Sequence, residues 1–253
     1  MTDKPPQRSK SLSSKPTVNG GSTPSIHRTT STTSLSALPS KPHINCGRTS
    51  ALAGKYLALD CEMVGVAPDP TNDSILARVS LVNYHGDLIY DSFVLPTEPV
   101  LDYRTHVSGV SPHHLRPGQA RPFADVQKDV AALLKGKILV GHALRNDEKV
   151  LFLSHPKRDV RDTARHPDFR KHSGGMAPSL KKLARVVLGW DIQGGEHSSI
   201  EDAQACMALF QREKEAFERE HVRVWGLPKK VVEKVEEVRE QVKKKKKKAK
   251  RKK

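Results

Sequence analysis

Two carboxylates, Asp60 and Glu62, interrupt an apolar run from Tyr56 to Gly65 that is typical of a buried β-strand. Because alternate side chains of a strand share a face and each residue advances about 3.3 Å, the two acids face the same way, with backbones roughly 7 Å apart. Their repulsion and desolvation require a nearby positive charge. A basic side chain would supply it, and so would divalent cations, which take carboxylate oxygens as ligands. The alternative is a frayed strand end at which both acids face water.

A third acid, Asp147, stands on the apolar face of a helix expected over residues 143–153. It follows Leu144 by three residues and precedes Leu151 by four, so the three side chains form one stripe. A charge in that stripe needs a partner. Alternatively, Asp147 only favours the helix N-terminus through the helix dipole.

A fourth acid, Asp202, stands near the start of a helix expected over residues 200–220, and Cys206 follows it on the buried side. With Ser199 it also fits a variant capping box. His197 precedes it by five residues, just ahead of the helix. Four carboxylates and one histidine of this kind can together hold two divalent ions and activate water for attack on phosphorus.

The elements that must position these side chains follow from hydrophobic periodicity. Strand patterns over residues 56–65, 75–83 and 88–95 predict an antiparallel meander. Further along, strand patterns occur at 138–141 and 158–163, and helical patterns at 123–134, 143–153, 180–188 and 200–220. This order predicts an α/β fold with a mixed five-stranded sheet flanked by helices. The long connection over residues 96–121 shows no regular pattern, and its length suggests a function.

The charge of +16 is carried by the two ends of the 253-residue chain. Residues 1–50 hold seven Lys/Arg and one Asp, and residues 241–253 hold ten Lys/Arg and no acid. Residues 51–240 therefore sum to zero. Nucleic-acid affinity would come from the tails or from a local patch, not from a generally basic domain.

The composition of the ends predicts three regions. With 19 Ser/Thr and six Pro in residues 1–50, we expect a disordered basic tail over 1–52; a transit peptide is the alternative, which the repeated prolines disfavour. A folded domain is expected over 53–220, and a charged helix with a lysine-rich tail over 221–253. The three cysteines form no close pair, which gives no sign of a zinc site or a disulfide framework. No apolar run reaches the roughly 18 residues of a membrane span.

Three motifs in order resemble those of the DEDDh exonuclease superfamily. They are residues 60–62 (Asp-x-Glu), 141–147 (Gly-His-Ala-Leu-x-Asn-Asp) and 197–203 (His-Ser-Ser-x-Glu-Asp-Ala). Residues 61–65 (Cys-Glu-Met-Val-Gly) and 103–109 (Tyr-Arg-Thr-x-Val-Ser-Gly) are similar to the RNA exonuclease 4 branch. The resemblance covers roughly residues 55–215.

The resemblance implies an RNase H-like (DnaQ-like exonuclease) fold and 3′-to-5′ hydrolysis that releases nucleoside 5′-monophosphates. By this analogy Asp60 would bridge two Mg²⁺ ions, for which Mn²⁺ should substitute. Glu62 and Asp202 would complete the site of the attacking water, and Asp147 would hold the second ion. His197 would take the proton from that water.

The resemblance also implies that Met63 and Arg104 meet the terminal nucleotide and its phosphate; core packing and a solvated loop cation are their alternatives. We expect single-stranded RNA 3′ ends as substrate, with pre-ribosomal RNA, a nuclear or nucleolar location and a monomer as further expectations. The block of cations from Lys243 to Lys253 would serve nuclear import, RNA tethering or both. Competing hypotheses are a non-catalytic RNA-binding or ribosome-assembly scaffold and a DNA exonuclease.

Overall fold

The computed structural model describes residues 52–227 and 229–250. The expectation of a disordered tail over 1–52 therefore falls, apart from Leu52, outside the described residues, as do the last three residues of the lysine-rich tail. Within the described residues, no helix is both long enough and apolar enough to cross a membrane.

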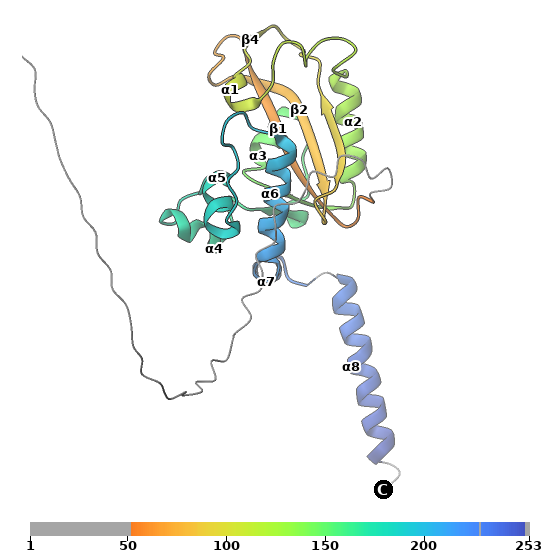
Figure 1. The fold of residues 1–253 in the computed structure, drawn as a ribbon. Helices are drawn as coiled ribbons and strands as arrows, with labels where there is room; N and C mark the ends of the chain where they lie inside the picture. The colour runs from red at the N-terminus through yellow and green to blue at the C-terminus, as the bar shows by residue number, and fades with distance from the viewer. Residues whose placement is uncertain (1–51, 228, 251–253) are drawn as a thin grey trace, which may run out of the picture. The chain divides into compact units, whose positions relative to one another are not determined.

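The sheet is built around β1 (Tyr56–Val66), the strand that carries the first two acids. On one side β1 pairs antiparallel with β2 (Ser74–Asn83), and β2 pairs antiparallel with β3 (Leu88–Phe93). On the other side β1 pairs parallel with β5 (Ile138–Gly141), and β5 with β6 (Val160–Asp162). The order β3-β2-β1-β5-β6 (Figure 1) confirms the predicted mixed sheet of five strands.

A sixth strand and a short helix lie in the connection that was expected to lack structure. β4 (Val100–Asp102) pairs antiparallel with the end of β1, where Val66 opposes Val100. The helix α1 (Thr105–Ser108) follows it. That prediction was wrong because elements of three and four residues are too short to show a period.

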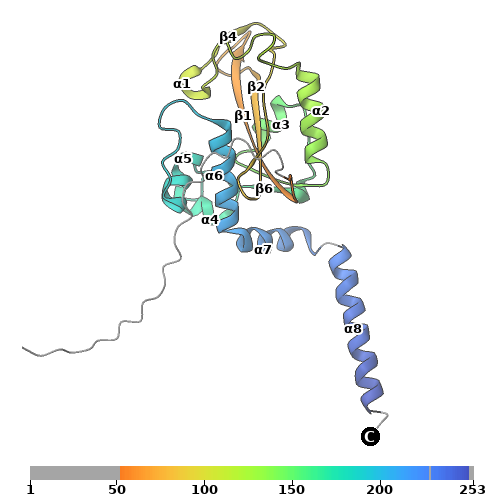
Figure 2. The ribbon, with the colours of Figure 1, turned by 45° about the vertical axis from the view of Figure 1, so that its right-hand side comes forward.

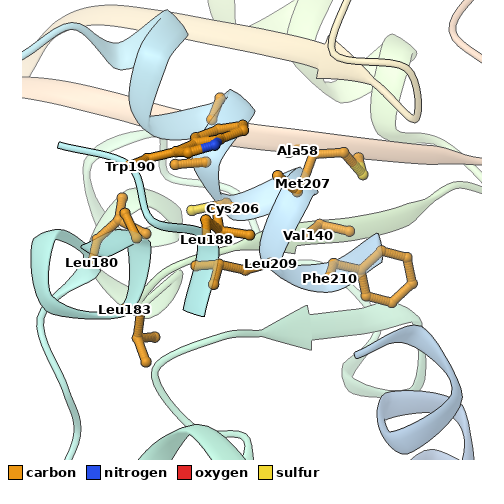
Figure 3. Close-up of a cluster of buried hydrophobic side chains, with 14 of the residues drawn as sticks. Ala58, Val140, Leu180, Leu183, Leu188, Trp190, Cys206, Met207, Leu209 and Phe210 are labelled. Carbon is orange, nitrogen blue, oxygen red and sulfur yellow. The ribbon is translucent and has the colours of Figure 1, made fainter. Parts of the chain in front are cut away.

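Helices cover both faces of the sheet, and the alternation along β1 decides which residues face which helices (Figures 1 and 2). Leu57 and Leu59 pack in one apolar cluster with residues of α2 (Phe123–Leu134) and α3 (Arg145–Val150). Ala58 packs on the opposite face, in a second cluster that includes residues of α5 (Leu180–Leu183), the π-helix that continues it (Ala184–Leu188) and α6 (Ser199–Arg212). Figure 3 shows side chains of α6 against Ala58 and Val140. Asp60 and Glu62 stand two and four residues after Ala58 on β1, so their side chains point to the same face of the sheet, toward α6.

Two predicted helices differ from the observed ones. The helix expected over 143–153 is shorter, because Ala143 (φ 55°) and Phe152 (φ 48°) both adopt the left-handed conformation. The helix expected over 200–220 is two helices, α6 and α7 (Lys214–Trp225), which meet at Glu213, where the backbone leaves the helical region.

Three short elements lie between the main ones: α4 (Pro167–Arg170) and two 3₁₀ turns (Lys157–Asp159 and Lys171–Ser173). The C-terminal helix α8 (Lys229–Lys250) has 22 residues.

Candidate active site

Three of the four predicted acids come together. One carboxylate oxygen of each of Asp60, Glu62 and Asp202 lies within 4.8 Å of the other two. The first two come from alternate positions of β1, and the third comes from the first turn of α6, which covers that face of the sheet. Glu62 is 6% exposed and Asp202 is 3% exposed. The water-facing alternative is therefore wrong for Glu62, and Asp60 is half-buried within β1 and not at a frayed strand end.

The start of α6 is fixed to the sheet by hydroxyl groups and not by a capping box. Ser198 is the N-cap residue and makes no side-chain capping bond, so the capping alternative for Asp202 is wrong. Ser199 is fully buried, and its Oγ lies 2.6 Å from Oγ of Ser80 on β2. Ser80 in turn donates to Oδ1 of Asp91 at 2.7 Å. Because the Asp202 carboxylate is not used for capping, it is available to the strand acids.

Asp147 is 5% exposed on α3, beside the buried Leu144 and Leu151, as the predicted stripe requires. It is not one of the three acids that meet within 4.8 Å. The charge of Asp147 nevertheless acts on this group of acids, because burial first and the Asp147 carboxylate second raise the pKa of Asp60. Burial and the Asp147 charge also raise the pKa of the buried Cys61 thiol.

Burial raises the pKa of all four carboxyls. The pKa of Glu62 rises to about 8, through burial and then the charge of Asp202, although Arg78 opposes the shift. Burial raises the pKa of Asp147 to about 7 and that of Asp202 to about 6.

The free oxygens of this cluster fit divalent cations. Within the described residues, Oε1 of Glu62 and Oδ1 of Asp202 are buried without a hydrogen-bond partner. Buried anions without partners are costly, and hard cations prefer such oxygens as ligands. The acidic set therefore has both the charge and the free ligand atoms that a cation site needs.

His197 lies at the edge of the acidic cluster. Its Nδ1 is 3.9 Å from Oδ2 of Asp202, and its side chain is 26% exposed. Its backbone N–H donates to the carbonyl of Val107 at 2.8 Å, which ties it to α1. Burial, with the charge of Lys181, lowers the pKa of His197 below 6.5. The ring is therefore neutral at neutral pH and able to accept a proton.

Gln193 is a site residue that sequence reasoning missed. Its Nε2 donates to Oδ2 of Asp202 at 2.8 Å, and this bond lowers the pKa of that carboxyl against the effect of burial. Gln193 stands in an irregular segment with φ 54°. A glutamine in such a segment gives no periodic signal, so nothing in the sequence pattern could have singled it out.

The two predicted substrate contacts lie in different surroundings. Met63 is half-buried on β1 and packs partly against the cluster that contains Leu59. The Arg104 guanidinium donates to the carbonyl of Pro70 and, at 3.0 Å, to Oγ of Ser74. It thus links the loop of α1 to the turn between β1 and β2. Their roles toward a substrate stay predictions.

Comparisons with known proteins agree with this fold and this acidic set. A family model described as Exonuclease matches residues 57–210. The chain belongs to this exonuclease family and, within it, to the RNA exonuclease 4 branch of the DEDDh superfamily that its motifs indicated.

Two curated relatives illustrate the similarity. The chain is 57% identical over 199 residues to RNA exonuclease 4 of Aspergillus fumigatus, a match that covers 78% of this chain and 63% of the relative. It is 53% identical over 169 residues to RNA exonuclease 4 of Saccharomyces cerevisiae, covering 66% of this chain and 57% of the relative. The chain thus spans about six tenths of the length of these relatives.

Solved structures with a similar fold include the Pan2 catalytic unit of Neurospora crassa, with a TM-score of 0.58 and 26% identity over 72% of this chain and 32% of that one. The Saccharomyces cerevisiae Pan2 exonuclease module in complex with A7 RNA has a TM-score of 0.57 and 30% identity, covering 70% of this chain and 32% of that one.

Proposed function

We propose that the chain is a metal-dependent 3′-to-5′ exoribonuclease that releases nucleoside 5′-monophosphates. The observation that carries the proposal is the meeting of three carboxylates within 4.8 Å: Asp60 is half-buried, and Glu62 and Asp202 are buried, each with an unpartnered oxygen. A scaffold protein would have no need to keep such mutually repelling groups in its interior. This argues against the non-catalytic alternative.

Asp60, Glu62, Asp147 and Asp202 would hold two Mg²⁺ ions, replaceable by Mn²⁺, which when bound supply the positive charge that activates water and stabilises the leaving oxygen. His197, neutral and beside Asp202, would accept the proton of the attacking water. Gln193 would keep Asp202 oriented through its hydrogen bond, which leaves Oδ1 of that carboxylate free.

RNA is the proposed substrate because the curated relatives are named RNA exonucleases and similar Pan2 modules have been solved with RNA. We further propose single-stranded 3′ ends and a monomeric state, with pre-ribosomal RNA as the physiological substrate on the strength of the resemblance and a nuclear or nucleolar location on the strength of the lysine-rich end. Single-stranded substrates fit because unstacked ends can thread into a buried acidic site.

A labelled oligonucleotide tests the activity and its direction. A 20-nucleotide RNA labelled at its 5′ end should shorten stepwise from the 3′ end with Mg²⁺, and released nucleotides should carry a 5′-phosphate. EDTA and the Asp60→Ala variant should both stop the reaction. Equal degradation of a matched DNA oligonucleotide would remove the RNA assignment, and no Mg²⁺-dependent degradation of either would remove the exonuclease assignment.

The lysine-rich end is proposed to tether RNA through its phosphates, a role compatible with nuclear import. Deletion of residues 243–253 should weaken RNA binding and flatten its dependence on salt, because fewer counterions are released. Hydrolysis of a short RNA at saturating concentration should be unchanged. If RNA affinity depends on salt concentration as steeply after the deletion as before it, the lysine-rich end does not tether RNA.

A further inference from the structure

The carboxyl ends of β5 and β6 are joined by contacts that involve no member of the acidic set. Oδ1 of Asp162, the last residue of β6, accepts the backbone N–H of Ala143 at 2.9 Å and that of Ala164 at 2.9 Å. The next residue, Thr163, is fully buried, and both its N–H and its hydroxyl donate to the carbonyl of Gly141 at 2.9 Å. These bonds attach β6 to the chain just ahead of α3.

The segment attached in this way is strained and tightly packed. Ala143 has φ 55°, a left-handed conformation that a residue with a Cβ adopts only when its surroundings impose it. A Cβ on Gly141 would lie 2.4 Å from Cδ2 of Leu144, so the chain turns sharply over that leucine. The Asp162 carboxylate accepts a hydrogen bond from the backbone N–H of Ala143, the strained residue.

The strained turn leads directly into the helix of an acidic residue. α3 begins at Arg145, two residues after Ala143, and Asp147 is its third residue. The helix is only six residues long, so its own hydrogen bonds cannot fix its position firmly. Its direction at the start is therefore set by the turn.

We propose that Asp162 is a positioning residue for Asp147: its Oδ1 holds the left-handed turn at Ala143, and the turn sets where α3 places the Asp147 carboxylate. The consequence for cation binding rests on the proposed function. The Asp162 charge also acts on Asp147 directly, because burial first and the Asp162 carboxylate second raise the pKa of Asp147. Charge and hydrogen bond are separable by substitution: asparagine keeps an acceptor oxygen and loses the charge.

The first measurement is amide hydrogen exchange on the full chain without metal or RNA. Asp162→Ala (D162A) should speed exchange of the amides in residues 142–151 at least tenfold and leave β1 and β2 unchanged. D162N should exchange like the wild type. Adding Ala143→Gly to D162A should restore part of the protection, because glycine adopts φ 55° without strain.

The second measurement is kinetic. D162A should lower kcat on a single-stranded RNA 10- to 100-fold and raise the Mg²⁺ concentration for half-maximal rate, with the KM for RNA within twofold of the wild type. D162N should stay within threefold of the wild-type kcat, and D162A/A143G should recover at least fivefold over D162A.

Three results would overturn the proposal: wild-type exchange in D162A, a D162N protein as impaired as D162A, or faster exchange spread over β1 and β2 as well. If D162A does not fold, hydrogen exchange is compared between D162A/A143G and the wild type instead. If neither variant folds, Asp162 does more than position the turn at Ala143, and the proposal is also overturned. Because the exchange measurement needs neither metal nor RNA, an inactive wild-type protein would contradict only the proposed function.

Discussion

Nδ1 of His197 lies 3.9 Å from Oδ2 of Asp202, beyond hydrogen-bond distance but close enough for the carboxylate to attract a proton on that nitrogen. A proton on Nδ1 leaves Nε2 without one, and it is then the nitrogen that can act as a base. The contact therefore joins the proposed proton acceptor to a proposed cation ligand.

Replacing His197 by alanine should lower kcat at least 100-fold, since a positioned general base contributes about 10²- to 10⁴-fold. The melting temperature and Mg²⁺ binding should stay near wild type, because the ring is partly exposed and makes no contact to the other acids. Single-turnover hydrolysis with calorimetric Mg²⁺ titration measures both. An unchanged kcat would remove His197 from the mechanism.

Removing the hydrogen bond from Gln193 to Asp202 should also impair the enzyme. Gln193→Met keeps the length of the side chain and loses the donor, so the Asp202 carboxylate is no longer held in one orientation. A hydrogen bond to a charged group contributes about 1.5–3 kcal/mol, and we expect kcat to fall about 10-fold. Gln193→Asn, which keeps the donor on a shorter stem, should lie between Met and wild type. Equal rates for all three proteins would contradict the role.

Because Gly109 lies close to the backbone of His197, replacing it by alanine should lower kcat. A Cβ on Gly109 would lie 2.7 Å from the carbonyl oxygen of His197, and its φ is 63°. Gly118 is a matched control, because its φ is 89° and a Cβ there meets nothing within 4 Å. Both alanine variants should lose about 1–2 kcal/mol through backbone strain. Only Gly109→Ala should also lower kcat, about 10-fold or more. Equal rates for the two variants would show that the clash does not reach His197.

The metal-free protein should lose stability as the pH rises from 5.5 to 8. The folded pKa values of Glu62 (about 8, ordinarily 4.5) and Asp147 (about 7, ordinarily 3.8) are raised. The folded state then binds more protons than the unfolded chain in this window, and stability falls with rising pH. The two shifts together should cost about 5 kcal/mol, or about 15 °C in melting temperature. Thermal melts in EDTA measure it.

Charge removal and metal addition should each reverse that loss. At pH 8 in EDTA, Asp147→Asn should melt above the wild type although it is inactive, because one buried charge is gone. Mg²⁺ should raise the wild-type melting temperature more at pH 8 than at pH 5.5. A wild-type protein equally stable at both pH values in EDTA would contradict the buried, ionised cluster.

A separate pH effect should come from His166, which is 5% exposed and stacks on Phe217 of α7 with ring centroids 3.9 Å apart. Burial lowers its pKa, so the unfolded chain binds a proton below pH 6.5 that the folded protein does not, and stability is lost as the pH falls. His166→Phe should remove this loss. The melting temperature of the wild type minus that of His166→Phe should fall by about 3 °C from pH 7 to pH 5. A constant difference would contradict a neutral, buried His166.

Local periodicity determined which side chains could do chemistry. The two-residue spacing of Asp60 and Glu62 on an apolar strand is enough to place both on one face, because strand alternation depends only on the chain itself. The same holds for Asp147, whose helical spacing to two leucines predicted its burial. The order of strands and helices likewise predicted a mixed sheet, and the motif resemblance identified the family.

Only the tertiary structure decided how these parts meet. Three carboxylates come within 4.8 Å because α6 lies across the face of β1 and is fixed there by Ser199 and Ser80, residues 119 positions apart in the chain. The hydrogen bonds of Gln193 and Asp162 are likewise made by side chains without a periodic signal. Such contacts depend on packing between distant segments, and backbone strain such as that at Ala143 persists only where those segments impose it.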